Sequence, residues 1–171
     1  MDSQLSFRKA EMNDMPAIRE LVTSAVRHLQ AHGNMQWDER YPLDCDFIPD
    51  IETDTQWLGF IDEELAVIYA LNMTHDAQYD AVTWPHEGEP YTVLHRFIVH
   101  PSFQGQGIAK AALAHIIEEL QAQGIRNIRL DTYRHNAASQ HLYRGFGFVD
   151  VGIAYFRDKV FDLMELHLEN A

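Results

Sequence analysis

The stretch from Val93 to Ile116 constrains the fold most, because it reads as a strand, a glycine loop and a helix in immediate succession. A mostly apolar run, 93–99, that includes β-branched residues stops just before Pro101. Gly105 and Gly107 follow in a short loop. Apolar residues then recur at helical spacing, at Ile108, Ala112, Ile116 and Leu120.

This order predicts an anion site. The first amides of a helix lack intrahelical partners and lie at the positive end of its dipole, where phosphate groups bind. Glycines without a Cβ let such an anion approach the main chain. Residues 91–117 contain no Asp or Glu, although the chain holds 26 in 171 residues. An even distribution would place roughly four there, so the window favours an anionic ligand.

Composition narrows the classes of function. A length of 171 residues predicts a single domain spanning 1–171. The net charge of −13 argues against nucleic acid as a partner, because phosphate contacts need a basic face. Cys45 is the only cysteine, which excludes an intrachain disulfide and a multi-cysteine metal site. We expect no membrane partner and a cytoplasmic location, since no apolar run has membrane-spanning length and the N-terminus does not read as a signal peptide.

Periodicity predicts alternating helices and strands. Strands are expected at residues 5–9, 57–61, 65–73, 93–99, 127–131, 148–155 and 160–167. Helices are expected from Asn13 or Asp14 to Gly33, across 43–51, from 107 to 124, and across 136–144 with Gly145 and Gly147 as its end. A tight acidic turn, 62–64, makes a hairpin, and the long polar loop 75–90 is a candidate functional segment.

The predicted fold class is α/β (α+β). The crossover through 107–124 makes the sheet locally parallel, and the hairpins make the rest antiparallel. We therefore expect a mixed, mostly antiparallel central sheet of about seven strands, flanked by about four helices.

Two blocks resemble a known family. Gln104-Gly105-Gln106-Gly107-Ile108-Ala109 is similar to the Q/R-x-x-G-x-G/A pyrophosphate loop of the GNAT superfamily of acyl-CoA-dependent N-acetyltransferases, and Val99-His100-Pro101 resembles the end of that family's fourth strand. The second block, Asn136-Ala137-Ala138-Ser139, Leu142-Tyr143 and Gly145-Phe146-Gly147-Phe148, is similar to its N-x-x-A/S…L-Y…G-F pattern. The expected element order agrees over nearly the whole chain.

Other interpretations of the glycine loop explain less. A plain strand-to-helix turn accounts for Gly105 and Gly107 but not for the second block. A Rossmann site would need a further glycine and an acidic residue about 20 positions on. Asp131 lies at roughly that distance, yet the loop is one glycine short and the second block stays unexplained. A Walker loop is excluded because no Gly-Lys-Ser/Thr follows.

The resemblance implies a set of residues that bind acetyl-CoA, the expected acyl donor. Main-chain groups of the segment Phe97, Ile98 and Val99 would pair with the pantetheine arm as an added strand does, with Phe97 and Val99 making the bonds. An amide near Val99 would polarise the thioester carbonyl. The pyrophosphate would be held by the amides of Gln104, Gly105, Gln106, Gly107, Ile108 and Ala109. Asn136, with Ser139 as a second candidate, would hydrogen-bond the arm.

Tyr143 is the candidate general acid. The thiolate that leaves when an amine attacks needs a proton, and the family places its acid at this position. The structural alternative is a core tyrosine whose hydroxyl is satisfied.

His95 is the candidate general base, because its ordinary pKa suits the removal of a proton from an ammonium group. It lies two residues before Phe97 and should share that strand face. It resembles a strand histidine of the arylalkylamine branch, whereas the glutamate of histone-type members aligns with Val93. A packed histidine is the structural alternative. Other candidate bases are His86, Glu87 and Glu89.

Acceptor recognition has weaker signals. Residues 38–64 carry ten carboxylates and one basic residue, which would favour a cationic amine. Trp37, Tyr41 and Trp84 are the candidate substrate-binding residues, with Tyr79 as a further aromatic wall. A solvated acidic face and ordinary core aromatics would explain the same pattern. The ten histidines form no His-x-x-x-His pair backed by an acid, so no metal is expected.

The sequence therefore predicts an N-acetyltransferase that moves acetyl from acetyl-CoA directly to a primary amine of a small molecule or peptide. Cys45 lies outside both blocks, which argues against a covalent intermediate. The alternative is a non-catalytic acyl-CoA sensor or interaction module on the same fold. Relatives often pair through C-terminal strands, and the apolar segment 160–168 permits a homodimer. Polyamines, arylalkylamines, amino acids, antibiotics and protein amines all remain open as acceptors.

Overall fold

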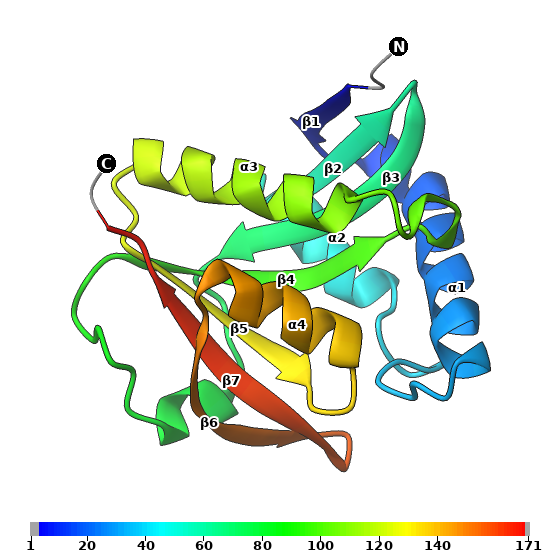
Figure 1. Ribbon diagram of the computed structural model, residues 1–171. Helices are drawn as coiled ribbons and strands as arrows, with labels where there is room; N and C mark the ends of the chain where they lie inside the picture. The colour runs from blue at the N-terminus through cyan, green and yellow to red at the C-terminus, as the bar shows by residue number, and fades with distance from the viewer. Residues whose placement is uncertain (1–3, 170–171) are drawn as a thin grey trace. The chain divides into compact units, whose positions relative to one another are not determined.

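The computed structural model describes residues 4–169. Within that range seven strands alternate with four α-helices and three short 3-10 helices (Figure 1). The strands are β1 (Leu5–Lys9), β2 (Gln56–Ile61), β3 (Glu64–Asn72), β4 (Tyr91–Val99), β5 (Asn127–Tyr133), β6 (Val149–Phe156) and β7 (Lys159–His167). The helices are α1 (Met15–Ala31), α2 (Asp44–Glu52), α3 (Ile108–Ala122) and α4 (Ala137–Phe146), with η1 (Met12–Asp14), η2 (Ala77–Ala81) and η3 (Pro101–Phe103).

The strand order is β1-β2-β3-β4-β5-β7-β6, with β4 and β5 parallel and the pairs β1–β2, β2–β3, β5–β7 and β6–β7 antiparallel. This confirms the predicted fold class of a mixed, mostly antiparallel sheet with four helices. The chain divides into two compact units. Of the described residues, the first contains 4–71 and 96–113, and the second contains 72–95 and 114–169.

In the first unit, apolar residues separate into two clusters. The inward stripe of α1, including Ile18 and Leu21, packs with Phe47 of α2 and with Leu58 and Ile68 of the hairpin. A second cluster contains Ile61, Ala66, Val67, Ile108 and Ala112. β3 contributes to both clusters, with Ile68 in the first and Ala66 and Val67 in the second. The sheet of this unit is therefore apolar on both faces.

In the second unit, β5, β7 and β6 lie side by side, with β6 at the edge (Figure 1). The ladder between β4 and β5 covers only Tyr91–Val93 of β4, whereas β5 pairs with β7 along its whole length. Buried aromatic residues from the loop before β4 fill the space against the strands. The core cluster consists of Tyr79, Trp84, Val93, Ala154, Phe156, Phe161 and Leu163.

Several predicted boundaries need correction. Gly145 does not end α4, which continues to Phe146 and stops at Gly147 with φ 98°. Only Gly147 sits in the left-handed region, so only Gly147 supplies a terminator. The strand expected at 127–131 extends to Tyr133 because β7 pairs with it throughout. The loop expected at 75–90 contains η2, which periodicity over so few residues does not reveal.

Candidate functional site

The glycine loop of the first unit is open and leads into the start of α3. Gly105 and Gly107 have φ values of 75° and 76°, and a Cβ built on either would meet no atom within 4 Å. The first bond of α3 runs from the amide of Ala111 to the carbonyl of Gly107 at 3.0 Å. The amides of Ile108, Ala109 and Lys110 therefore have no acceptor within the helix, and α3 has no acidic residue in its first turn. The loop thus combines main-chain N–H donors at the start of α3 with open space beside Gly105 and Gly107.

His100 fixes the chain that leads into this loop. Its Nδ1 accepts the amide of Ser102 at 3.1 Å, so the ring proton lies on Nε2. That Nε2 donates to the Glu20 carboxylate of α1 at 3.1 Å. The Gln104 side chain donates to the carbonyl of Val99 at 3.3 Å and closes the turn. Sequence reasoning named Gln104 and Val99 but missed the role of His100, because its partner is 80 positions away.

The strand before the loop contains a backbone irregularity at Arg96, whose φ is 44°. This left-handed residue interrupts the alternation on which we placed His95 and Phe97 on one face. His95 is half-buried, Phe97 and Val99 pack against a core cluster, and Ile98 is buried. The interrupted alternation removes the geometric argument for His95, whose role as the base stays a prediction.

Arg96 itself was not predicted. Its guanidinium forms an ion pair with Asp50 of α2, and both side chains are nearly buried. Its Nη1 also donates to the Tyr41 hydroxyl at 3.1 Å. An arginine inside an apolar strand was the signal in the sequence, because a buried charge needs a buried partner.

The second unit holds Tyr143 at the end of α4. The helix starts at Asn136, whose Oδ1 accepts the amide of Ser139 at 3.1 Å. These two residues are thus brought together, with the Asn136 side chain as the N-cap. At the other end, the amide of Phe148 binds the carbonyl of Tyr143 at 3.1 Å and the amide of Gly147 binds that of Arg144 at 3.0 Å. This is a Schellman motif, and its usual apolar contact is the edge packing of the Tyr143 and Phe148 rings, with centroids 5.4 Å apart.

The phenol of Tyr143 is buried and protonated. Its side chain is buried, and burial together with the charge of Asp131 raises its pKa well above 10.0. The neutral form therefore dominates at physiological pH, as a general acid requires. Asp131 lies on β5 and accepts the Tyr79 hydroxyl at 2.6 Å. Sequence reasoning considered Asp131 only for the Rossmann interpretation.

Two of the other candidate bases belong to a polar network. His86 Nδ1 lies 2.7 Å from the buried carboxylate of Glu165, and its ring stacks on that of His167 with centroids 3.9 Å apart. Glu89 accepts a hydrogen bond from Asn127 at 3.2 Å. These contacts give His86 and Glu89 structural partners, whereas Glu87 lines a small cavity.

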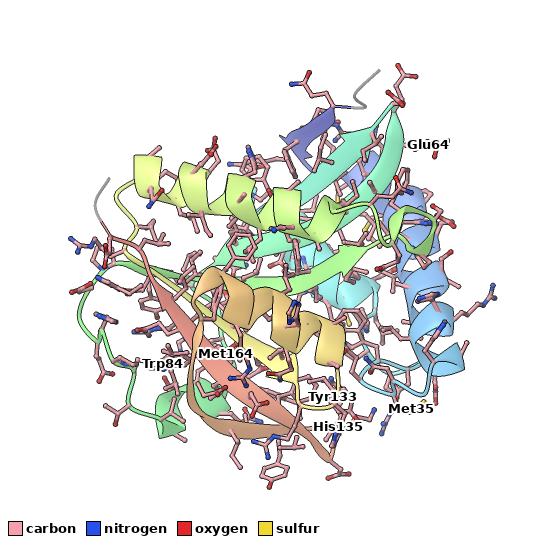
Figure 2. The ribbon with its side chains drawn as sticks, in the orientation of Figure 1. Met35, Glu64, Trp84, Tyr133, His135 and Met164 are labelled. Atoms are coloured by element: carbon pink, nitrogen blue, oxygen red, sulfur yellow. The ribbon has the colours of Figure 1, made fainter. Side chains whose placement is uncertain are left out.

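The candidate acceptor aromatics differ in their environments. In the first unit, Trp37 packs against the core and Tyr41 binds Arg96. In the second unit, Trp84 comes from the loop before β4 (Figure 2). Its side chain is 4% exposed, and its Nε1 donates to the carbonyl of Tyr79 at 2.9 Å. Trp84 is thus a core residue of the loop before β4.

Several carboxylates of the acidic segment, 38–64, have partners within the protein. Asp38, Asp44 and Asp50 form ion pairs with arginines. Asp46 accepts a hydrogen bond from the amide of Leu43, so four of the ten carboxylates have a partner in the protein. These partners reduce the field that the segment could exert on a cationic acceptor.

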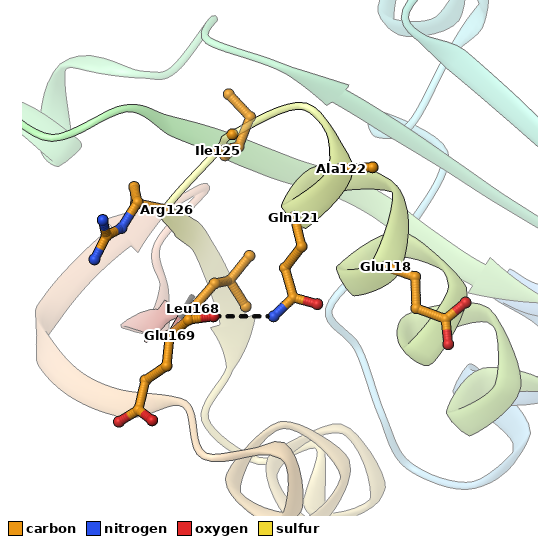
Figure 3. Close-up of a pocket in the computed structure, with 8 residues that line it drawn as sticks. Glu118, Gln121, Ala122, Ile125, Arg126, Leu168 and Glu169 are labelled. Atoms are coloured by element: carbon orange, nitrogen blue, oxygen red, sulfur yellow. Dashed lines mark hydrogen bonds between the residues drawn. The ribbon is translucent and has the colours of Figure 1, made fainter. Parts of the chain in front are cut away.

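The larger cavity, about 470 Å³, lies at the C-terminal end of α3 and so does not involve the glycine loop (Figure 3). Its one basic residue, Arg126, is accompanied by Glu118 and Glu169, and the side chain of Gln121 donates to the carbonyl of Glu169 at 3.3 Å. Across residues 4–169 no group of three or more His, Cys, Asp or Glu side chains is arranged to hold a metal ion. No helix in that range is both long and apolar enough to span a bilayer.

The model of the Acetyltransferase (GNAT) family matches residues 15–148, which include both blocks and most of both units. The chain belongs to the GNAT family of acetyltransferases. The prediction made from the two blocks is confirmed. An N-acetyltransferase activity on an amine acceptor, with acetyl-CoA as donor, follows from this membership and from the relatives of the chain.

Three similar proteins span nearly the whole chain. The L-methionine sulfoximine/L-methionine sulfone acetyltransferase of Salmonella typhimurium is 28% identical, over 96% of this chain and 95% of the relative. The L-amino acid N-acyltransferase MnaT of Escherichia coli is 27% identical over the same shares, 96% and 95%. The crystal structure of a GNAT acetyltransferase from Streptococcus agalactiae superposes with a TM-score of 0.85 at 29% identity and covers 96% of each chain. This GNAT likeness therefore extends across the length of the protein.

Proposed function

We propose that residues 1–171 form one catalytic domain that acetylates the primary amine of a small acceptor, with Tyr143 as general acid. The observation that carries this proposal is the buried phenol of Tyr143, fixed by the Schellman motif and held neutral by burial and by Asp131. A sensor that only binds acyl-CoA has no need of a proton donor at this place.

The proposed reaction is a direct transfer. The neutral amine attacks the thioester carbonyl, a C–N bond forms, the C–S bond breaks, and CoA leaves as a thiolate. Tyr143 gives its proton to this thiolate and recovers one from solvent. The proton lost by the amine goes to His95. The amides from Gly105 to Ala109 hold the pyrophosphate, whereas the amide of Gln104 donates to the carbonyl of Pro101 at 3.2 Å and shapes the turn before them. Main-chain groups of Phe97 and Val99 hold the pantetheine arm, and this fixed placement supplies much of the rate.

The relatives that match along their whole length favour a small acceptor. One is named for methionine sulfoximine and methionine sulfone, and another for L-amino acids. Relatives named for the alanine of ribosomal protein bS18 match over only 35% of this chain. We therefore propose a free amino-acid-like amine as the acceptor, ahead of a protein N-terminus.

A thiol-release assay tests this function. The protein is incubated with acetyl-CoA and separate amines from the amino-acid, polyamine, arylalkylamine and peptide classes. Release of CoA thiol that requires an amine and yields the acetylated amine supports the enzyme. Tight binding of acetyl-CoA by calorimetry without release for any amine would instead support the sensor.

A cytoplasmic location and a homodimer are further parts of the proposal. The apolar segment 160–168 belongs mostly to β7, which lies between β5 and β6, so its burial already accounts for its composition. The apolar side chains exposed on edge strand β6, Val149, Ile153 and Tyr155, are the better surface for a second copy. Sedimentation equilibrium of the protein and of an Ile153→Lys variant tests that surface.

A further inference from the structure

A small cavity of about 210 Å³ lies within the second unit and has a basic residue in its wall. It is lined by His75, Tyr79, Asp80, Val82, Trp84, Glu87, Gly88, Tyr91 and Arg129. Its volume corresponds to about seven water molecules and lies below the usual range for drug-sized ligands. A small metabolite fits it, whereas a folded partner does not.

Arg129 of β5 is the unusual residue of this wall, because its side chain is only 7% exposed. Its Nε donates to Glu165 at 3.2 Å, and the same carboxylate binds His86 at 2.7 Å through its other oxygen. The guanidinium lies over the ring of Tyr91 at 3.9 Å and over that of Trp84 at 4.6 Å. These contacts fix its plane and cover its faces, so only its edge can bind a ligand. A carboxylate matches such an edge with two parallel hydrogen bonds.

The rim of the cavity has the opposite charge. Glu87 is exposed, and Asp80 is 75% exposed and pairs with His75 at 3.0 Å. Arg129 in the wall and the carboxylates of Asp80 and Glu87 at the rim complement a zwitterion. Its carboxylate would lie inside the cavity and its ammonium group at the rim. A simple polyamine would instead place positive charge beside Arg129.

A hydrogen bond within the same unit links the cavity to Asp131, whose charge acts on the proposed acid, Tyr143. Tyr79 lines the cavity and donates to Asp131 at 2.6 Å. Arg129 and Asp131 are two positions apart on one face of β5, which separates their Cα atoms by about 7 Å. The carboxylate and amine of one α-amino acid can span that spacing.

From this arrangement we infer that Arg129 binds the α-carboxylate of an amino-acid acceptor in the cavity and directs its amine toward Asp131. The inference rests on the proposed function and adds a specificity-determining residue to it. It commits the acceptor to a free α-amino acid, because an amide or a peptide lacks the α-carboxylate beside the reacting amine.

Three matched acceptors test this inference: L-methionine sulfone, its carboxamide and its decarboxylated amine. For the wild type, kcat/KM should fall on the order of 100-fold when the carboxylate is removed, which corresponds to a lost charge-assisted pair. Arg129→Gln should lower kcat/KM for the amino acid by a similar factor, mainly through KM, and leave the two other acceptors almost unchanged. Arg129→Lys should restore part of the loss, and Arg126→Gln, which changes the other cavity, should have no effect.

Removing Arg129 leaves the buried Glu165 without its arginine partner, which could itself destabilise the fold. The double variant Arg129→Gln/Glu165→Gln removes both charges and is therefore measured in parallel, so that lost recognition is separated from misfolding. Equal kcat/KM values for the amino acid and its amine in the wild type, or faster acetylation of a peptide, would overturn the inference while the acetyltransferase function stands. Thiol release with none of the amines would overturn the proposed function. In that event calorimetry of L-methionine sulfone against its carboxamide still tests the cavity, because equal affinities would contradict a carboxylate site.

Discussion

Tyr79 donates a 2.6 Å hydrogen bond to Asp131. Tyr79 lines the small cavity, and burial together with the negative charge of Asp131 raises the pKa of Tyr143, so this pair links the cavity to the proposed acid. Tyr79 comes from η2 in the loop before β4, and Asp131 from β5. The loop 75–90, which its length and polarity made a candidate functional segment, therefore supplies a fixed contact to Asp131.

Tyr143→Phe should lower kcat by roughly 100-fold or more, because the leaving thiolate loses its proton donor. The KM for acetyl-CoA should change little. Phenylalanine keeps the ring contact with Phe148, so the fold should persist. Steady-state kinetics measure both constants, and Tyr155→Phe, at a tyrosine that is 63% exposed, is the control. Unchanged turnover would remove Tyr143 from the mechanism.

The raised pKa of Tyr143 predicts a pH effect on stability. Burial, and then the charge of Asp131, favour the neutral phenol in the folded protein. The resulting stabilisation is fully present below the ordinary pKa of 10.0 and is lost as the pH rises from there through the raised folded pKa. Urea unfolding between pH 8 and 11 should thus show a steeper loss of stability for the wild type than for Tyr143→Phe. Parallel curves would indicate an ordinary phenol.

Gly107→Ala should raise the KM for acetyl-CoA by about tenfold or more, since a Cβ would occupy the space where an anion approaches the amides. The left-handed φ of 76° should also cost about 1 kcal/mol of stability. Gly33→Ala is the matched control, because Gly33 has φ 77° and equally open surroundings but lies outside the loop. Equal KM values for the two variants would contradict the pyrophosphate role.

Asp50→Asn should destabilise the protein by about 3 kcal/mol, because it leaves the buried Arg96 without its counter-ion. Asp150→Asn, which breaks an ion pair with Arg144 that is about half exposed on both sides, should cost less than about 1 kcal/mol. Chemical denaturation measures both variants. Equal midpoints would show that the Arg96 pair does not stabilise the first unit.

The sequence predicted the elements well wherever an apolar period ran for several turns or a whole strand. The stripe of α1 and the apolar run of β7 are examples. The failures are local: Gly145 looked like a terminator although only Gly147 takes the left-handed conformation. Which of two nearby glycines ends a helix depends on a backbone angle that composition does not reveal.

For the site, the glycine loop, Asn136 and Tyr143 followed from contiguous patterns. The pairs Arg96–Asp50, Arg129–Glu165 and Tyr79–Asp131 did not, because their members are 46, 36 and 52 positions apart. Such contacts depend on strand register, which a single sequence leaves open. The backbone irregularity at Arg96 could not be read from the sequence either. Because it interrupts the alternation of the strand, the prediction that His95 shares a face with Phe97 lost its basis.

Direct transfer of acetyl to an amine, with Tyr143 as the acid, is the reaction proposed for this chain. Its most direct test counts products in one reaction, with CoA thiol measured by colour and the acetylated amine by mass spectrometry. The account predicts one acetylated amine for each thiol in the wild type and an almost complete loss of both in Tyr143→Phe, which still binds acetyl-CoA. Thiol release without acetylated amine, or full turnover by Tyr143→Phe, would contradict it.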